Sequence, residues 1–279
     1  MDVGAHRLHL QVMGEGHTGP TVILDAGMAS FSTNWHWVQS DLASSVRVVA
    51  YDRAGLGWSE PGPEPRDAHQ SATELHLALQ RAGIGGPYVV AGHSYGGLVA
   101  RVFADLYPDD VSGLVLVDAS HPDQWTHIPA SMNGRITGLS TRILSNLASL
   151  GLLRVFDPVT PQVATGLPPH EYSQMRAILA LPGSTGIGAD ALSVWDTRTR
   201  PQVAAARPLG ALPLTVLSVS EQPLFGEVLT ALQAELPALS SNGVHHIVDG
   251  ATHEDLISNE AHAAVVAEAI RQLVATIGD

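Results

Sequence analysis

The sequence predicts an α/β protein with a mostly parallel, doubly wound sheet, and two observations carry this prediction. Short apolar runs rich in β-branched residues alternate with segments in which apolar residues recur at helical spacing. Most of these runs have no polar face, which is typical of strands covered by helices on both sides. With 279 residues, the chain is long enough for one large domain with an insertion. We therefore expect strands and helices to alternate around a single core.

The alternating polar and apolar residues of segment 1–10 predict a first strand. Further strands are expected at residues 21–24, 46–50, 88–90, 114–117, 214–217 and 244–248. Helices are expected at residues 67–82, directly after Ser94, at 227–239 and at 260–277.

The alternation stops between about His121 and Pro208, where the sequence has no strand signal and many prolines. A helix-like apolar run extends there from Ile136 to Leu150. We expect residues 121–208 to form a helical cap over the carboxyl edge of the sheet. Residues 1–120 and 209–279 would then form the core domain.

A Gly-x-Ser-x-Gly motif lies between the strand expected at 88–90 and the helix that follows, with Gly92, Ser94 and Gly96 as its fixed positions. Between a strand and a helix, this motif makes a sharp turn that exposes the serine hydroxyl at the sheet edge. A glycine-rich turn with an incidental serine is the alternative, and the flanking strand and helix disfavour it. Ser94 is therefore the predicted nucleophile.

A serine hydroxyl needs a base within hydrogen-bonding reach and an acid behind that base. His253 lies in a loop between the last expected strand and the final helix, so it would stand over the same sheet edge as Ser94. Asp118 ends an apolar strand, where a carboxylate needs a polar partner. Glu221 follows the next strand and also satisfies the chain order serine, acid, histidine. We predict Asp118 as the acid and keep Glu221 as the alternative.

Two backbone amides are expected to bind the oxyanion. One is the N–H of Tyr95, at the start of the helix after Ser94. The other is the N–H of Met28, in a strand-to-loop turn where Gly27 permits close approach of the backbone.

These motifs together resemble the α/β-hydrolase superfamily over the whole chain except the insertion. The segment Tyr51-Asp52-Arg53-Ala54-Gly55-Leu56-Gly57-Trp58-Ser59 is similar to a loop that is mainly structural in that superfamily. The resemblance implies an α/β-hydrolase fold for the chain outside the insertion. Two departures stand out, because many relatives have a histidine before the glycine of the oxyanion turn and commonly place the acid one strand later than Asp118.

Composition excludes several classes of function. The formal net charge of −13 lacks the basic footprint that nucleic acid requires. All 14 basic residues are arginines and there is no cysteine, which removes Schiff-base lysines, Walker-type phosphate loops, thiol nucleophiles and cysteine-ligated metals. The histidines show no metal-ligand spacing, so neither a metal nor a cofactor is expected. No apolar stretch approaches the roughly 20 residues of a membrane span, and we expect a cytoplasmic protein.

The expected function is that of a serine hydrolase, with a small or medium, mostly hydrophobic carboxylic ester as its substrate. Cleavage of a carbon–carbon bond, an amide or a lactone by the same residues is an alternative. Haloalkane dehalogenases and epoxide hydrolases of this fold are disfavoured, because they have an aspartate where Ser94 stands. The non-enzymatic alternative is a small-molecule receptor with the same fold.

Overall fold

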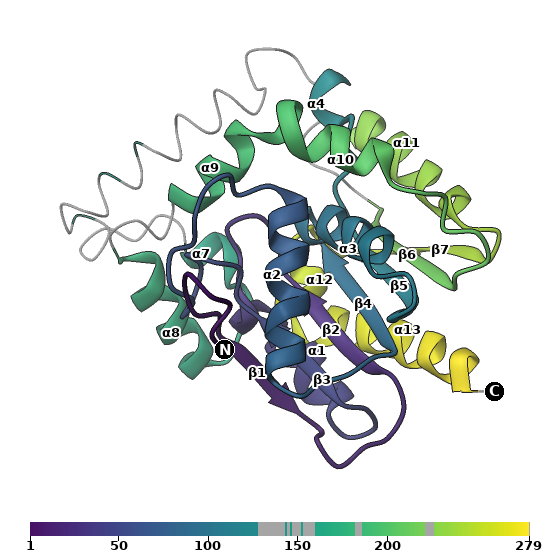
Figure 1. The fold of residues 1–279 in the computed structure, drawn as a ribbon, viewed down its shortest axis with the longest axis horizontal. Helices are drawn as coiled ribbons and strands as arrows, with labels where there is room; N and C mark the ends of the chain where they lie inside the picture. The colour runs from purple at the N-terminus through teal and green to yellow at the C-terminus, as the bar shows by residue number, and fades with distance from the viewer. Residues whose placement is uncertain are drawn as a thin grey trace.

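The computed structural model describes residues 1–127, 160–181, 186–220 and 226–278, together with the single positions 143, 146 and 152. Within these residues, the strands form one seven-stranded sheet in the order β1-β3-β2-β4-β5-β6-β7 (Figure 1). The strands are β1 (Leu10–Met13), β2 (Thr21–Asp25), β3 (Val48–Tyr51), β4 (Tyr88–His93), β5 (Val111–Val117), β6 (Leu214–Val219) and β7 (Gly243–Val248). Only the β1–β3 pair is antiparallel among them. The predicted mostly parallel, doubly wound sheet is confirmed.

The register of the sheet brings the carboxyl ends of its central strands to one edge. Asp25 at the end of β2 pairs with Gly92 of β4, and His93 at the end of β4 pairs with Val117 of β5. Val117 in turn pairs with Leu217 of β6. The turns that follow these strands therefore lie next to one another, which is where α/β sheets place their ligand sites.

The first strand begins later than the sequence predicts. Residues 1–10 do not form a strand along their length, because the chain turns back at Gly4, whose φ is +106°, and Asp2 makes an isolated antiparallel bridge with Arg7. Val3 and Leu8 are buried beneath this turn. The alternation of polar and apolar residues thus reflects a small folded-back turn, and strand pairing starts only at Leu10.

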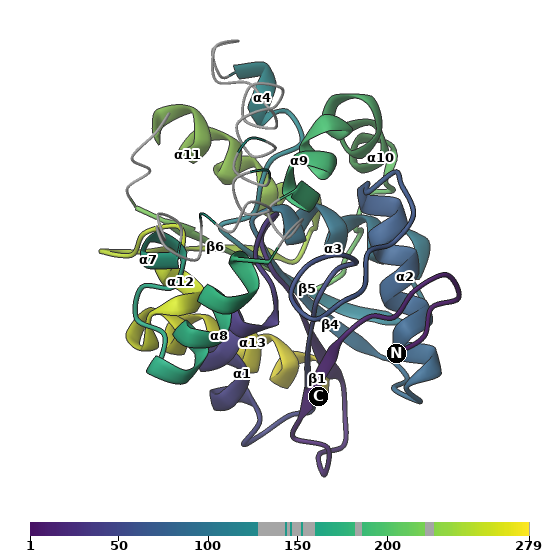
Figure 2. The ribbon, with the colours of Figure 1, turned by 90° about the vertical axis from the view of Figure 1, so that its left-hand side faces the viewer.

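Helices cover both faces of the sheet, as Figures 1 and 2 show. Along the chain outside the insertion they are α1 (His36–Leu42), α2 (Ala68–Arg81), α3 (Tyr95–Leu106), α11 (Gly226–Glu235), α12 (Asp255–Ser258) and α13 (Glu260–Gly278), with short 3₁₀ helices η1 (Ser32–Trp35) and η4 (Leu236–Leu239). Helix α2 begins where the sequence predicts, since the Asp67 side chain accepts a hydrogen bond from the Gln70 amide as an N-cap.

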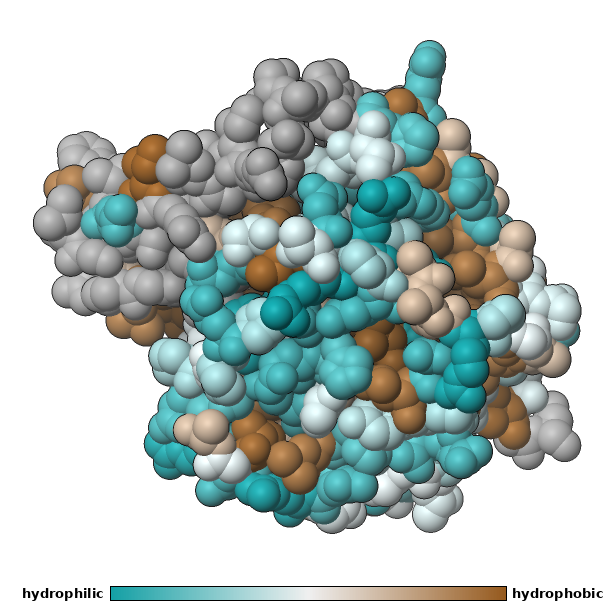
Figure 3. Space-filling view, turned by 45° about the horizontal axis from the view of Figure 1, so that its top comes forward, coloured by the Kyte–Doolittle hydropathy of each residue, from teal (hydrophilic) through white to brown (hydrophobic). Residues whose placement is uncertain are grey.

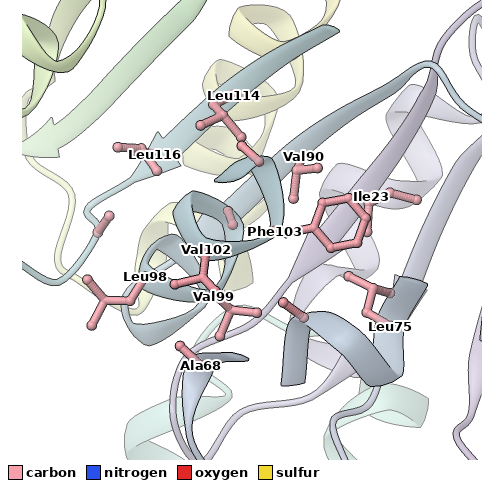
Figure 4. Packing of buried hydrophobic residues seen from close by; sticks show 14 of the residues in the cluster. Ile23, Ala68, Leu75, Val90, Leu98, Val99, Val102, Phe103, Leu114 and Leu116 are labelled. Atoms are coloured by element: carbon pink, nitrogen blue, oxygen red, sulfur yellow. The ribbon is translucent and has the colours of Figure 1, made fainter. Parts of the chain in front are cut away.

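Each face of the sheet has its own apolar core, because alternate residues of a strand point to opposite sides. On one face, Val90 and Leu114 pack with Phe103 of α3 and Leu75 of α2 (Figure 4). On the other face, residues such as Val89 pack against α1, α12 and α13. The inner strands β2 to β6 are mostly apolar on both sides for this reason, and the turns at their ends rest on this packed core.

The described part of the insertion is helical. It contains α4 (Gln124–His127), α7 (Thr160–Val163), α8 (Pro169–Leu179), α9 (Gly186–Ser193), the π-helix η3 (Trp195–Thr199) and α10 (Arg200–Ala205). The helix expected from Ile136 to Leu150 lies outside the described residues, apart from two isolated positions. In the portion of the chain that is described, no helix has the length and apolar character needed to cross a bilayer. On the face shown in Figure 3, hydrophilic residues predominate and apolar residues form separate groups.

Candidate active site

Ser94 occupies the sharp junction between β4 and α3. Its backbone has φ +53° and ψ −121°, a conformation that L-residues rarely adopt, and its side chain is half-buried. The junction is tight enough to need glycine on both sides of the serine. A Cβ at Gly92 would lie 2.4 Å from the Gly96 oxygen, and a Cβ at Gly96 would lie 2.3 Å from the Asp25 oxygen.

Asp118 directly follows β5, the strand beside β4. Its φ of +40° makes it, with Ser94, one of two non-glycine residues with positive φ in the described ranges. Backbone hydrogen bonds join the two junctions, from the Ser94 amide to the Val117 oxygen at 3.2 Å and from the Ser120 amide to the Ser94 oxygen at 3.0 Å. Ser94 and Asp118 are therefore held in a fixed relation by adjacent strands.

His253 lies in the loop between β7 and α12, and its Nδ1 is 2.5 Å from Oδ2 of Asp118. The Asp118 side chain is 1% exposed and that of His253 is 34% exposed. The other oxygen, Oδ1 of Asp118, accepts hydrogen bonds from the Val219 amide and from Nε2 of Gln233, both at 3.3 Å. The buried carboxylate thus has donors on both of its oxygens, and one of them is the imidazole.

The surroundings of His253 change its basicity in opposite directions. Burial lowers the pKa of the imidazole, and the hydrogen bond and charge of Asp118, with the charge of Glu254, more than offset this effect. The pKa of His253 is therefore above its ordinary value of 6.5. A base of this kind becomes neutral, and able to accept a proton, as the pH rises through that higher value.

His93 makes a contact with this loop that the sequence did not indicate. Its Nε2 donates a hydrogen bond to the His253 backbone oxygen at 2.9 Å, and the two ring centroids are 4.4 Å apart. Burial and the neighbouring charge of His253 lower the pKa of His93 to about 3, so it stays neutral. His93 therefore acts as an anchor for the loop that carries His253.

The turn after β2 lies beside Ser94. A Cβ added at Gly27 would be 3.4 Å from Cβ of Ser94, and Met28 follows in the same turn. Tyr95 is the first residue of α3, where backbone amides have no partner within the helix. The expected amides of Met28 and Tyr95 thus belong to two turns that flank the serine, and the first of these turns touches it.

The alternative acid and the residue that follows His253 are both glutamates. Glu221, the alternative acid, lies outside the described residues. Glu254 follows His253, and its Oε2 is buried without a hydrogen-bond partner among the residues that the structure describes. Burial raises the pKa of Glu254, against the opposing charge of His253.

The segment from Tyr51 to Arg53 holds the base of the Met28 turn. Asp52 accepts hydrogen bonds from the Ser32 and Trp58 amides, which fits the structural role that the resemblance implies. Arg53 instead reaches Asp25 at the end of β2, and the Tyr51 hydroxyl donates to the same carboxylate at 2.7 Å. Burial raises the pKa of Asp25 and the charge of Arg53 opposes it.

Sequence reasoning missed this cluster, although it contains a usable signal. Asp25, like Asp118, is a carboxylate at the end of a buried, mostly apolar strand, and such a group needs a charged or hydrogen-bonding partner. Across the described ranges, no group of three or more histidine, aspartate or glutamate side chains is placed to hold a metal ion.

Comparison with known proteins adds the family context. A family model described as the alpha/beta hydrolase fold matches residues 20–142. A protein of Gibberella zeae, named as an AB hydrolase superfamily protein, is 32% identical over 189 residues, which make up 64% of this chain and 53% of that protein. The chain spans about half or less of the length of the first curated relatives it matches.

Solved structures match over nearly the whole chain. A thermophilic esterase from Thermogutta terrifontis has a TM-score of 0.72 at 22% identity, with 98% of this chain and 94% of that chain covered. The epoxide hydrolase CorEH has a TM-score of 0.71 at 24% identity, with 95% and 94% covered. The chain therefore has the α/β-hydrolase fold, as the resemblance implies.

Proposed function

We propose that this protein is a serine hydrolase that cleaves carboxylic esters through an acyl-enzyme on Ser94. The observation that carries the proposal is the 2.5 Å contact between Nδ1 of His253 and Oδ2 of the buried Asp118. An imidazole held by a carboxylate at one nitrogen presents its other nitrogen as a base. Ser94 lies at the junction of the neighbouring strand with α3, and a serine nucleophile needs such a base.

In the proposed acylation, Oγ of Ser94 attacks the ester carbonyl carbon while Nε2 of His253 accepts the hydroxyl proton. Asp118 keeps the proton of Nδ1 in place and stabilises the imidazolium. The amides of Tyr95 and Met28 donate hydrogen bonds to the carbonyl oxygen as it becomes negative. The C–O bond then breaks, and the leaving alkoxide takes the proton from His253 and departs as an alcohol.

In deacylation, His253 takes a proton from water as the water oxygen attacks the acyl carbon. The Ser94 oxygen leaves with the proton that His253 returns, and the carboxylic acid is released. No metal or cofactor enters this sequence of steps.

Apolar residues of the insertion near the site support a small or medium, mostly hydrophobic substrate. Trp195 packs on the Tyr95 ring with centroids 5.8 Å apart, and a Cβ at Gly188 of α9 would lie 3.8 Å from Cγ of Met28. The insertion thus approaches both turns that flank Ser94, and its sequence sets the acyl or alcohol group that fits. The serine at position 94 disfavours epoxide opening, which needs a carboxylate nucleophile in this fold.

The test is the initial rate of hydrolysis of p-nitrophenyl esters of increasing acyl length, with wild type and Ser94→Ala side by side. We expect an optimum of acyl length in the wild type and no turnover above background in the variant. Labelling by a fluorophosphonate, located by peptide mass, should modify Ser94. Full activity of Ser94→Ala would overturn the proposal. Labelling of Ser94 without ester turnover would move the activity to amide, lactone or carbon–carbon cleavage.

A further inference from the structure

The Arg53 side chain donates hydrogen bonds to four consecutive residues of the turn beside Ser94. Its Nη1 donates to Oδ1 of Asp25 and to the Ala26 oxygen at 2.6 Å. Its Nη2 donates to the Gly27 oxygen and to the Met28 oxygen at 3.3 Å. The Arg53 side chain is only 6% exposed, so these bonds form away from competing water.

These contacts fix the direction of the amides in the turn. The Gly27–Met28 peptide is trans, so its carbonyl and its N–H point in opposite directions. Because the Gly27 oxygen is bound to Arg53, the Met28 N–H points away from the guanidinium. The same reasoning applies to the peptides on either side, so the N–H groups of Gly27, Met28 and Ala29 all face away from Arg53.

Arg53 also contacts the second turn. Its guanidinium carbon lies 5.3 Å from the centroid of the Tyr95 ring, within the range of a cation–π contact. We propose that Arg53 is a positioning residue that fixes the orientation of both backbone amides of the oxyanion site. It orients the Met28 amide by binding the carbonyl oxygens of that turn, and it orients the Tyr95 amide by its contact with the Tyr95 ring. This inference rests on the proposed function and deepens it, because it assigns a role to a residue that touches no substrate.

Asp25 and Tyr51 keep the guanidinium in this orientation. The Asp25 side chain is 1% exposed, and its two oxygens bind Arg53 and the Tyr51 hydroxyl. A carboxylate so buried requires a cation, and a planar guanidinium with two terminal nitrogens can serve the carboxylate and three carbonyls together. A lysine ammonium at the same place has one nitrogen and cannot span these acceptors.

The test is the Arg53→Lys variant, which keeps the positive charge and removes the planar pair of terminal nitrogens. Arg66→Lys is the matched control, since Arg66 is 4% exposed and forms a two-pronged ion pair with Glu74, at 2.9 and 2.6 Å, outside the two turns. The measurements are kcat and KM on the best p-nitrophenyl ester, per active site titrated with fluorophosphonate. Inhibition by an alkylboronic acid, which forms a tetrahedral adduct on serine, is measured for both variants.

We expect Arg53→Lys to lower kcat about 10- to 100-fold and to change KM by less than about twofold. This loss of kcat is smaller than the roughly 10²- to 10³-fold loss that follows removal of a whole oxyanion donor, because both amides remain present. Boronic acid affinity should weaken by the factor by which kcat/KM falls. Arg66→Lys should lower the melting temperature about as much as Arg53→Lys does, and its kcat should stay within about twofold of the wild-type value.

Retention of wild-type kcat per titrated site by Arg53→Lys would overturn the positioning role, as would equal losses in both variants. If Ser94 of the wild type is not labelled, the proposed function fails and the positioning role fails with it. If Ser94 is labelled but no ester is turned over, the labelling rate of the two variants replaces kcat, with the same expected and contrary results.

Discussion

Replacing Asp118 by asparagine tests the proposed acid, and the structure determines which way the new amide will face. Asparagine tolerates positive φ, so the backbone at +40° can persist. Oδ1 of Asp118 accepts from the Val219 amide and from Gln233, which are both donors, so the amide oxygen of the variant belongs there. Its NH₂ group is then placed against Nδ1 of His253, in the position of Oδ2.

This orientation imposes the wrong tautomer on His253. With an NH₂ donor against it, Nδ1 must be the unprotonated nitrogen, and the proton sits on Nε2. An imidazole protonated at Nε2 cannot take the proton of Ser94. The variant therefore loses the base as well as the carboxylate.

The magnitude follows from these two losses. A hydrogen bond to a charged group contributes about 1.5–3 kcal/mol, equivalent to roughly 10- to 150-fold in rate. The wrong tautomer raises the loss, and a loss of about 10³- to 10⁴-fold in kcat is expected by analogy with serine hydrolases in which the triad aspartate becomes asparagine. The residual activity should appear at lower pH, because the hydrogen bond and charge that raise the pKa of His253 are both removed.

The assay is the pH profile of kcat/KM on the best p-nitrophenyl ester. Asp105→Asn is the control, since Asp105 accepts from Arg207 at 2.9 Å in a partly exposed pair at the far end of α3 and should change activity by less than about twofold. The reasoning is refuted if Asp118→Asn keeps kcat/KM within about threefold of wild type. Glu221→Gln would then test the alternative acid.

Three further variants probe the surroundings of the site. Gly96→Ala places a Cβ 2.3 Å from a backbone oxygen at the end of β2, so we expect a stability loss of about 1–3 kcal/mol by chemical denaturation, with Gly16→Ala, which meets nothing within 4 Å, unchanged. His93→Leu removes the donor to the His253 oxygen and should lower kcat/KM about fivefold, while His93→Gln, which keeps a donor, should lose less. Glu254→Gln removes a charge that raises the pKa of His253, so the acid limb of kcat/KM should move to lower pH. Because burial raises the pKa of Glu254, folding opposes its ionisation, and the wild-type protein loses stability as the pH rises above 4.5. The glutamine variant should therefore be more stable than wild type at pH 8 but not at pH 4.

The sequence was sufficient for the six strands after the first and for the closeness of Asp118 and His253, because parallel strands end at one edge of a sheet. The sequence could not predict the contacts of Arg53, because most of its partners are backbone oxygens. Every residue has a backbone oxygen, so no residue type marks such a partner in a sequence. Asp25 is separated from Arg53 by 28 positions, and only the pairing of β2 with β3 joins them. The first strand was misplaced because a turn at Gly4 produces the same alternation as a strand.

The strained backbone of Ser94 makes a prediction about stability that is separate from chemistry. Its φ of +53° is a conformation that glycine adopts freely and alanine does not, so Ser94→Gly relieves strain that Ser94→Ala retains. Both variants lose the nucleophile, yet the glycine variant should be more stable by about 1 kcal/mol, or roughly 2–4 °C in melting temperature. Equal melting temperatures would show that the junction carries no strain. A higher value for glycine would mean that β4, α3 and the adjoining Asp118 turn hold the serine in place at the expense of stability, as expected of a residue kept for its reactivity.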